Sequence, residues 1–403
     1  MDLNLADGDD WISVGEALLP DAITLRRAIH EEPELGLDLP LTTQKVLKAL
    51  EGLPLEIRQG PSTTGVLAIL RGSANGRTVL LRGDMDALPL TEDTGLTYMS
   101  RTLGAMHACG HDTHVAMLAG AARALCANRD KLAGTVMFMF QPGEEGHHGA
   151  RFMLDDGLID PLPDVAFALH ISPNMPRGVF ASRRGPLLAS ADVLKVRITG
   201  RGGHASMPQD ALDPIPVACE MVMALQTMIT RTIPVGDPAV LTIAKIESGT
   251  TNNIIPETAY LEGTLRTLSE HTRAKAQEGF VRVVRGIAEA HGVRAEPEII
   301  QGFPVTVNNA AAADLAERVA KATFGEDAWV TMPAPMMGAE DFAYVLQKAP
   351  GAMAFIGAAP DGTADYRACC PLHSNRMVLD ETVMARGIAM HCAYAQAALA
   401  EGI

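Results

Sequence analysis

Thr135-Val136-Met137-Phe138-Met139-Phe140 is a nearly unbroken apolar run, and it leads directly into Gln141-Pro142-Gly143-Glu144-Glu145-Gly146. A strand that is buried on both faces of a sheet has this composition, because helices cover both of its sides. The stretch from Asp164 to His170 repeats the pattern. Short apolar strands that alternate with helical segments predict an α/β sheet. These two runs therefore indicate the fold class of the first part of the chain.

Helical and strand patterns alternate around these two runs. Periodicity predicts helices over Pro20–Leu35, Thr42–Leu50 and Asp112–Ala127, with Asp112 as an N-cap, and strands over Gly65–Leu70 and Thr78–Arg82. Polar side chains that can do chemistry follow the strands, namely Asp84, Asp86, Glu144, Glu145 and His170. Ligand sites of open α/β sheets lie at the carboxyl ends of strands. We therefore expect a site at that edge of the sheet.

The pattern changes near Ser190. It predicts strands over Val193–Thr199, Val240–Ile246, Thr258–Leu265 and Val293–Ile300, and helices over Pro214–Arg231 and His271–His291. Their order, βαββαβ, is that of a ferredoxin-like α/β sandwich. A helix over Ala311–Phe324 and a strand over Met353–Ile356 then resume the first pattern. We therefore expect one domain from residues 1–189 and 303–403, with residues 190–302 inserted as a second domain.

Composition limits the classes of function. A chain of 403 residues with 47% hydrophobic residues exceeds the usual size of a single core, which also favours two domains. The net charge of −15 disfavours a nucleic-acid-binding surface. The acidic start Met1–Asp7 does not have the pattern of a signal peptide, and no apolar run has the length of a membrane span. Six scattered cysteines, two of them the neighbours Cys369 and Cys370, do not resemble a disulfide framework, so we expect a reduced, cytoplasmic protein.

The segment Met106-His107-Ala108-Cys109-Gly110-His111-Asp112 predicts a metal site. Cys109 and His111 are two residues apart, so an extended backbone points both side chains to one side. Thiolate, imidazole and carboxylate groups together suit a divalent transition metal. One carboxylate of the Glu144–Glu145 pair can bind metal, and the other can take a proton from water whose pKa the metal lowers. The spacing does not tell which glutamate does which, but the set indicates hydrolysis of a carbonyl compound.

Two other interpretations of Cys109 remain at this point. It could be a small buried hydrophobic residue, as free cysteines often are. It could also be a nucleophile that pairs with a histidine, as in thiol hydrolases. The second interpretation leaves the two adjacent glutamates without a role.

Seven ordered blocks make the sequence resemble the M20 metallopeptidase family. They are Arg82-Gly83-Asp84-Met85-Asp86-Ala87-Leu88-Pro89, His107–Asp112, Gln141–Gly146, Gly202-Gly203-His204-Ala205, Thr251-Asn252-Asn253-Ile254-Ile255-Pro256, Gly263-Thr264-Leu265-Arg266 and Gly338-Ala339-Glu340-Asp341-Phe342. The branch that they resemble contains hippurate hydrolase, N-acyl-amino-acid amidohydrolases and auxin-conjugate hydrolases. The resemblance extends from about Arg26 to His373, and an ordered match of seven blocks is far more specific than any single block.

The resemblance implies a mixed-sheet catalytic domain that binds two divalent ions, and an inserted lid domain through which two chains dimerise. It implies metal ligands at Cys109, His111, Glu145, His170 and His373, with Cys109 between the two ions. It implies Glu144 as general base, and His204, Asn253 and Arg266 at the substrate. Asp84 stands where peptidase branches have a histidine, and Met207-Pro208-Gln209 departs from relatives that have a histidine after the proline. The second departure bears on substrate preference.

Several candidate residues also have a structural interpretation. Asp86 could orient a ligand imidazole or cap a turn. His107, His114, His147 and His148 are taken as structural, although His114 shares a helix face with His111 and is the main alternative ligand. His204, which the resemblance places in the site of the partner subunit, could stabilise an oxyanion. Arg266 could clamp a carboxylate, and Asn253 could bind the same group or be a turn residue.

These observations predict a metal-dependent amidohydrolase that cleaves N-acyl-L-amino acids, hippurate-like or related conjugates, into a carboxylate and a free amino acid. The expected cofactors are two ions of Mn, Zn, Ni or Co, all of which these ligands tolerate. A dipeptidase or carboxypeptidase is the alternative function. A non-catalytic metal-binding protein on a hydrolase scaffold is a third interpretation, which the presence of Glu144 disfavours.

Overall fold

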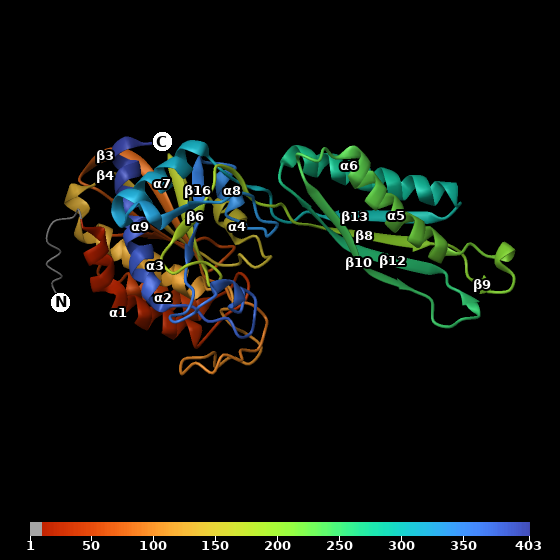
Figure 1. Cartoon of the computed structure of the whole chain (residues 1–403), viewed down its shortest axis with the longest axis horizontal. Helices are drawn as coiled ribbons and strands as arrows, with labels where there is room; N and C mark the ends of the chain where they lie inside the picture. Colours follow the sequence, from red (N-terminus) through yellow and green to blue (C-terminus); the bar gives the residue numbers. More distant parts are fainter. Residues whose placement is uncertain (1–9) are drawn as a thin grey trace. The chain divides into compact units, whose positions relative to one another are not determined.

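The computed structural model describes residues 10–403 and contains two compact units (Figure 1). Unit 1 comprises the described residues through Leu187 together with Val307–Ala334 and Asp341–Ile403. Unit 2 comprises Leu188–Thr306 and Pro335–Glu340. Among the described residues, no helix is long and apolar enough to cross a membrane. The stretch Met1–Asp7, from which we inferred that a signal peptide is lacking, lies outside the described residues.

Unit 1 is built on an eight-stranded sheet with the strand order β1-β2-β4-β3-β5-β16-β6-β15. The strands are β1 (Glu56–Arg58), β2 (Val66–Arg71), β3 (Ala74–Asp84), β4 (Ala133–Gln141), β5 (Val165–Ser172), β6 (Phe180–Ser182), β15 (Trp329–Thr331) and β16 (Gly351–Gly357). β3 runs parallel to β4 and β5, and β16 runs parallel to β5, whereas β2 pairs antiparallel with β1 and β4. The mixed sheet confirms the predicted α/β class, and both apolar runs of the sequence lie in its buried strands.

Helices cover the sheet of unit 1 (Figure 1). They are α1 (Trp11–His30), α2 (Pro40–Ala49), α3 (His111–Ala127), α4 (Gly149–Asp155), α7 (Ala310–Phe324), α8 (Ala343–Leu346) and α9 (Met384–Glu401). Helices α1, α3 and α9 pack on one another, and their apolar faces join β2 to β5 in one continuous core. The strands that carry the predicted site are therefore held in place by helices that pack on them through buried apolar side chains.

Several predicted helix boundaries were wrong, among them the end of α1, which lies at His30 and not at Leu35, and the start of α2, which lies at Pro40 and not at Thr42. Helix α1 begins at Trp11 and not at Pro20, because Asp10 caps it by accepting a hydrogen bond from the Ser13 backbone N–H. Pro20 therefore lies inside the helix. Helix α3 begins at His111 with Gly110 as its N-cap, so Asp112 is not the cap but a residue of the first turn.

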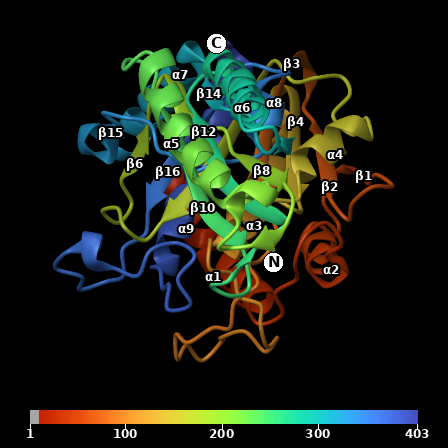
Figure 2. The same ribbon diagram turned by 90° about the vertical axis from the view of Figure 1, so that its right-hand side faces the viewer.

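Unit 2 contains a four-stranded antiparallel sheet with the order β10-β12-β8-β13. Its elements follow one another as β8 (Asp192–Thr199), α5 (Pro214–Thr232), β10 (Ala239–Ser248), β12 (Thr258–Thr267), α6 (Glu270–Ala290) and β13 (Arg294–Ile300). Burial alternates along β8 and β12, because one face of the sheet packs on a helix layer. Figures 1 and 2 show α5 and α6 side by side over that face, and their apolar residues join the sheet in one core.

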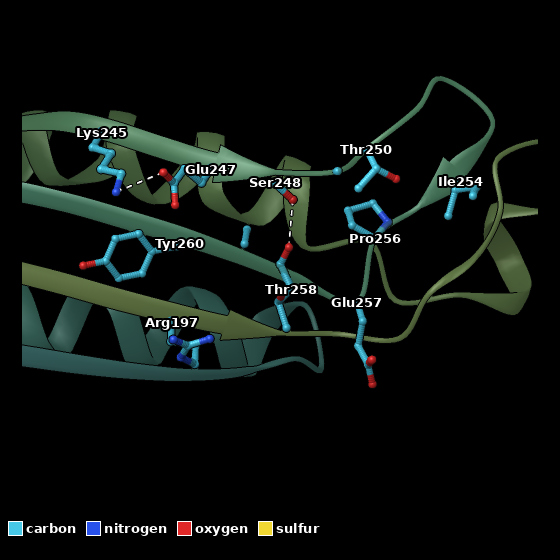
Figure 3. A pocket seen from close by; sticks show the side chains of 12 residues that line it. Arg197, Lys245, Glu247, Ser248, Thr250, Ile254, Pro256, Glu257, Thr258 and Tyr260 are labelled. Carbon is cyan, nitrogen blue, oxygen red and sulfur yellow. Dashed lines mark hydrogen bonds and ion pairs between the residues drawn. The ribbon is translucent and has the colours of Figure 1, made fainter.

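The opposite face of the unit 2 sheet is at least partly exposed and mostly polar, with Val193, Val240 and Ile300 as exposed apolar residues. It has an open hollow of about 700 Å³, which Figure 3 shows with Lys245, Tyr260 and Arg197 along it. Lys245 pairs with Glu247 at 2.9 Å, as the dashed line marks. The hollow is lined by unit 2 alone, and it contains none of the predicted site residues.

Two short strand pairs complete the fold. β9 (Gly203–His204) pairs with β11 (Ile254–Ile255) in unit 2, beyond the end of the sheet where Thr199 of β8 lies opposite Thr258 of β12. β7 (Gly185–Leu188) pairs with β14 (Thr306–Asn308), where the chain leaves and re-enters unit 1.

Candidate metal centre

The loop after β4 brings both glutamates to the carboxyl edge of the unit 1 sheet. The carboxylate of Asp86, which follows β3, accepts hydrogen bonds from the backbone N–H groups of Glu144 and Glu145 at 2.9 Å each. Because β3 and β4 are parallel neighbours, their carboxyl ends lie together and the two loops can bond. Asp86 thus fixes the turn that presents the two glutamate side chains.

Cys109 and His111 lie at the start of α3. Gly110 between them has a φ of 81°, a left-handed conformation that glycine adopts at little cost. A Cβ atom on Gly110 would stand 2.5 Å from Cγ2 of Ile171, so a side chain does not fit there. This tight turn places the thiol and the imidazole next to each other.

The five predicted metal ligands form two groups that share Cys109. Ligand atoms of Cys109, His111 and His170 lie within 4.8 Å of one another, and so do those of Cys109, Glu145 and His373. The Cys109 Sγ lies 3.5 Å from Nε2 of His170, and Oε1 of Glu145 lies 3.3 Å from Nε2 of His373. We expected these five residues to lie close together, and the structure brings them together.

Backbone carbonyls orient two of the imidazoles. Nδ1 of His111 lies 2.8 Å from the carbonyl oxygen of Asp86, and Nδ1 of His170 lies 2.7 Å from that of Ile171. A proton on each Nδ1 leaves the lone pair on Nε2 free to bind a cation. Nε2 of His111 is buried and has no hydrogen-bond partner among the described residues, which fits the presence of a cation there. The backbone of Asp86, and not its carboxylate, makes the short contact with the ligand imidazole.

Electrostatics in the two groups also fit divalent cations. Burial raises the pKa of the Cys109 thiol, so a nearby positive charge is needed to hold the thiolate. Burial lowers the pKa of His170 well below its ordinary value, which keeps the ring neutral. The nearby Cys109 thiol and Glu145 carboxylate raise the pKa of His373 to about 10, so a metal that binds there must displace a proton.

His114 is not available as a ligand, although it faces Asp84 and His111. Its Nδ1 is hydrogen-bonded to the Asp84 carboxylate, and its Nε2 accepts a hydrogen bond from the Ile171 backbone N–H at 2.8 Å. Both ring nitrogens are therefore occupied. Asp84 also pairs with Arg82, whose guanidinium reaches Asp341 at 3.1 Å. His114 thus belongs to a buried polar network that supports the site.

A second buried network, which the sequence analysis missed, holds the first turn of α3. Nε of Arg26 lies 2.7 Å from Oδ2 of Asp112, and Nδ1 of His30 lies 2.8 Å from the same oxygen. Nε2 of His30 faces Glu92 at 3.2 Å. Burial opposes ionisation of Asp112, but the charge of Arg26 lowers its pKa. The spacing of Arg26 and His30, four residues apart on an amphipathic helix, was the available signal.

His107 and His148 have structural surroundings, whereas His147 is exposed. His107 is fully buried, and burial lowers its pKa to about 3, so it is neutral. Nδ1 of His148 lies 2.9 Å from the Tyr344 hydroxyl. Neither is part of the two groups that share Cys109.

The predicted substrate residues all lie in unit 2, in two places. His204 is on β9 opposite Ile254, and the carbonyl oxygen of Asn253 accepts a hydrogen bond from the Ala205 N–H at 3.1 Å, so these two residues are neighbours. Arg266 is near the other end of β12, about 26 Å along the strand from Thr258 at 3.3 Å per residue. Burial lowers the pKa of its guanidinium. Within unit 2, Arg266 is therefore far from His204 and Asn253.

The chain is similar in sequence and in structure to known metal-dependent hydrolases. The profile of peptidase family M20/M25/M40 matches residues 80–397. Thermostable carboxypeptidase 1 of Saccharolobus solfataricus is 39% identical over 95% of this chain and 94% of its own length. N-acetyl-L-cysteine deacetylase of Bacillus subtilis is 38% identical over 90% of this chain and 84% of its own. The crystal structure of a dinuclear metal-binding M20 peptidase from Bacillus subtilis has a TM-score of 0.83 and 33% identity, with coverage of 96% and 99%.

Matches of this extent confirm the predicted family. The chain belongs to peptidase family M20/M25/M40. It is a metal-dependent hydrolase of amide bonds. The interpretation of the chain as a non-catalytic metal-binding protein was therefore wrong.

Proposed function

We propose that this member of the M20 family cleaves N-acyl-L-amino acids, hippurate-like or related conjugates, into a carboxylate and a free amino acid. The observation that carries the proposal is the pair of groups sharing Cys109, with the Glu144 side chain beside them. The relative that deacetylates N-acetyl-L-cysteine, 38% identical, supports this substrate class.

In this proposal Cys109, His111 and His170 hold one divalent ion, and Cys109, Glu145 and His373 hold the other. Such ions, when bound, lower the pKa of water and polarise a carbonyl group. The donor set suits Mn, Zn, Ni or Co. Cys109 has metal-binding side chains on both sides, His111 and His170 in one group and Glu145 and His373 in the other. This arrangement favours a metal ligand over a nucleophile.

Glu144 is the proposed general base. Its carboxylate lies 3.9 Å from Nε2 of His111, and its backbone N–H is held by Asp86. The side chain is largely buried, so a proton that the carboxylate accepts is shielded from bulk water. Glu144 takes a proton as water attacks the amide carbon, and it then delivers that proton to the leaving nitrogen.

We further propose a homodimer in which residues 190–302 act as the lid and dimerisation domain, and residues 1–189 and 303–403 as the catalytic domain. His204 and Arg266 are too far apart along unit 2 to contact one small substrate from the same chain. A site that uses both residues needs one of them from a second chain. Arg266 would bind the substrate carboxylate, and His204 with Asn253 of the partner chain would stabilise the oxyanion.

Complementation tests this dimer. His204→Ala and Glu144→Gln should each be nearly inactive, and a heterodimer of the two should regain activity because one of its sites is intact. Heterodimers are isolated with two different affinity tags. Lack of rescue in purified heterodimers would mean that His204 acts in its own chain or not at all.

A carboxypeptidase or dipeptidase is the second candidate, because the 39% identical relative is a thermostable carboxypeptidase. The two functions differ in the group on the carbonyl side of the scissile bond. Hydrolysis of N-benzoyl and N-acetyl amino acids should be faster than that of dipeptides with a free amine. A higher kcat/KM on the dipeptides would favour the second candidate.

A further inference from the structure

The adjacent thiols Cys369 and Cys370 have no role in the proposed reaction. They follow the short 3-10 helix η4 (Tyr366–Ala368) and come shortly before His373. Both are free, Cys370 is exposed and Cys369 is partly exposed. An accessible pair of thiols binds soft, thiophilic centres, because sulfur ligands select them.

The segment that carries the two thiols is held at both ends. The side-chain amide of Asn174 donates to the carbonyl oxygen of Cys369 at 2.9 Å and to that of Tyr366 at 3.3 Å. The backbone N–H of His373 donates to the carbonyl oxygen of Ala108 at 2.8 Å, directly before Cys109. Only three residues lie between these anchors, so little chain is available to absorb a change in the backbone at Cys369 before it reaches His373.

The backbone at Cys369 does not point the two side chains in the same direction. Cys369 has φ −61° and ψ 151°, polyproline II values at which successive side chains are turned by about a third of a turn from each other. One atom that bonds to both sulfurs must bring them to the same side, which requires rotation about the bonds between Cys369 and Cys370. His373 has a φ of 66°, an unusual value for a residue other than glycine. Its position therefore depends on the Ala108 anchor.

We propose that Cys369 and Cys370 form a dithiol site for trivalent arsenicals, and that its occupation draws His373 away from Cys109 and Glu145. With an arsenical R–As=O, two As–S bonds form, the As=O bond and two S–H bonds break, and the oxygen leaves as water with both protons. No atom changes its oxidation state. The second part of this inference rests on the proposed role of His373 as a metal ligand, whereas the first part does not.

The first test measures capture directly. Phenylarsine oxide is added to the manganese-loaded full-length chain, excess monothiol is added to reverse single-thiol adducts, and the intact mass and free thiols are determined. Wild type should retain one arsenical and lose two thiols. Cys369→Ser and Cys370→Ser should each retain none, and Cys219→Ser should behave like wild type, because Cys219 is an exposed single thiol in unit 2. Equal retention in all variants, or none in wild type, would overturn the proposal.

The second test measures bound manganese after desalting, because Mn²⁺ prefers oxygen and nitrogen ligands to thiols of this kind. Arsenical treatment should reduce the manganese content of wild type by about half and leave that of Cys369→Ser unchanged. Capture of the arsenical with full retention of manganese would overturn the link to His373. A wild-type chain that binds none of Mn, Zn, Ni and Co before treatment would instead contradict the proposed function, so the two failures are distinguishable.

Discussion

The two ligand groups that share Cys109 are built from different kinds of structure. His111 and His170 lie on α3 and β5, are buried, and have Nδ1 fixed by a backbone carbonyl. Glu145 and His373 lie on loops, and the side chain of His373 is 55% exposed. The first group is therefore preorganised by the core of unit 1, whereas the second depends on loop anchors. We infer that the first group binds its ion more tightly than the second.

The largest expected effect is that of metal removal. A chelator should abolish amide hydrolysis, and Mn, Co, Ni or Zn should restore it. Metal loss should occur in two stages. The ion of the Glu145–His373 group should be lost at low chelator concentration, and that of the His111–His170 group only at high concentration. Metal analysis and activity are measured on the same samples. Full activity in metal-free protein with an intact Cys109 would favour the thiol nucleophile instead.

The two adjacent glutamates should give opposite defects. Glu144→Gln should lower kcat by roughly a hundredfold or more, the scale of losing a general base, and should retain both ions. Glu145→Gln should lose the more weakly held ion. The matched pair differs by one position in the same turn, so each variant is the control of the other. If Glu144→Gln lost metal and Glu145→Gln kept it, the two roles would have to be exchanged.

Truncation of one histidine from each group should separate metal binding from stability. His373→Ala should lose one ion and lower the melting temperature of the metal-free chain by less than His170→Ala does, because its side chain is 55% exposed. His170→Ala should lose one ion and also lower that temperature by roughly 5 °C, because it removes a buried ring and leaves its partners unpaired. Equal melting temperatures would contradict the contrast between a core-supported group and a loop-supported group.

The smallest expected effect is in unit 2. Arg266→Ala should raise KM roughly tenfold with a smaller change in kcat, because the substrate carboxylate is present in both the ground and transition states. The effect should disappear for substrates whose carboxylate is amidated. Equal losses on acid and amide substrates would show that Arg266 does not bind that group.

The sequence predicted the parts of this molecule in which one pattern determines one structure. The apolar run before Glu144 predicted a buried strand, which is β4. The periodicity of residues 193–300 predicted the order of their strands and helices. The start of α1 was missed because Pro20 is typical of a first helical turn, whereas the cap at Asp10 has a weaker signal. Strands β6 and β15 were not predicted, because each has three residues, which are too few to show the two-residue period of a strand.

The polar networks around the site could not be predicted, because they join residues far apart in the chain. The contact between Arg26 and Asp112 and that between Arg82 and Asp341 exist only after the helices and the sheet have packed. The same limit applied to His114, whose exclusion as a ligand depends on the N–H of Ile171. The motif could place His114 on the same helix as His111, but only the fold shows that both of its nitrogens are occupied.

The discontinuity of unit 1 has a consequence for synthesis on the ribosome. Strand β16 lies between β5 and β6 in the sheet, yet it is made after the whole βαββαβ segment of unit 2. Unit 2 can therefore fold while the sheet of unit 1 still lacks the strand between β5 and β6. His373 emerges later still, so nascent chains can assemble the Cys109–His111–His170 group before the second group exists. Chains that stop just before Gly351, where β16 begins, would thus contain a folded unit 2 and an open, aggregation-prone sheet edge in unit 1.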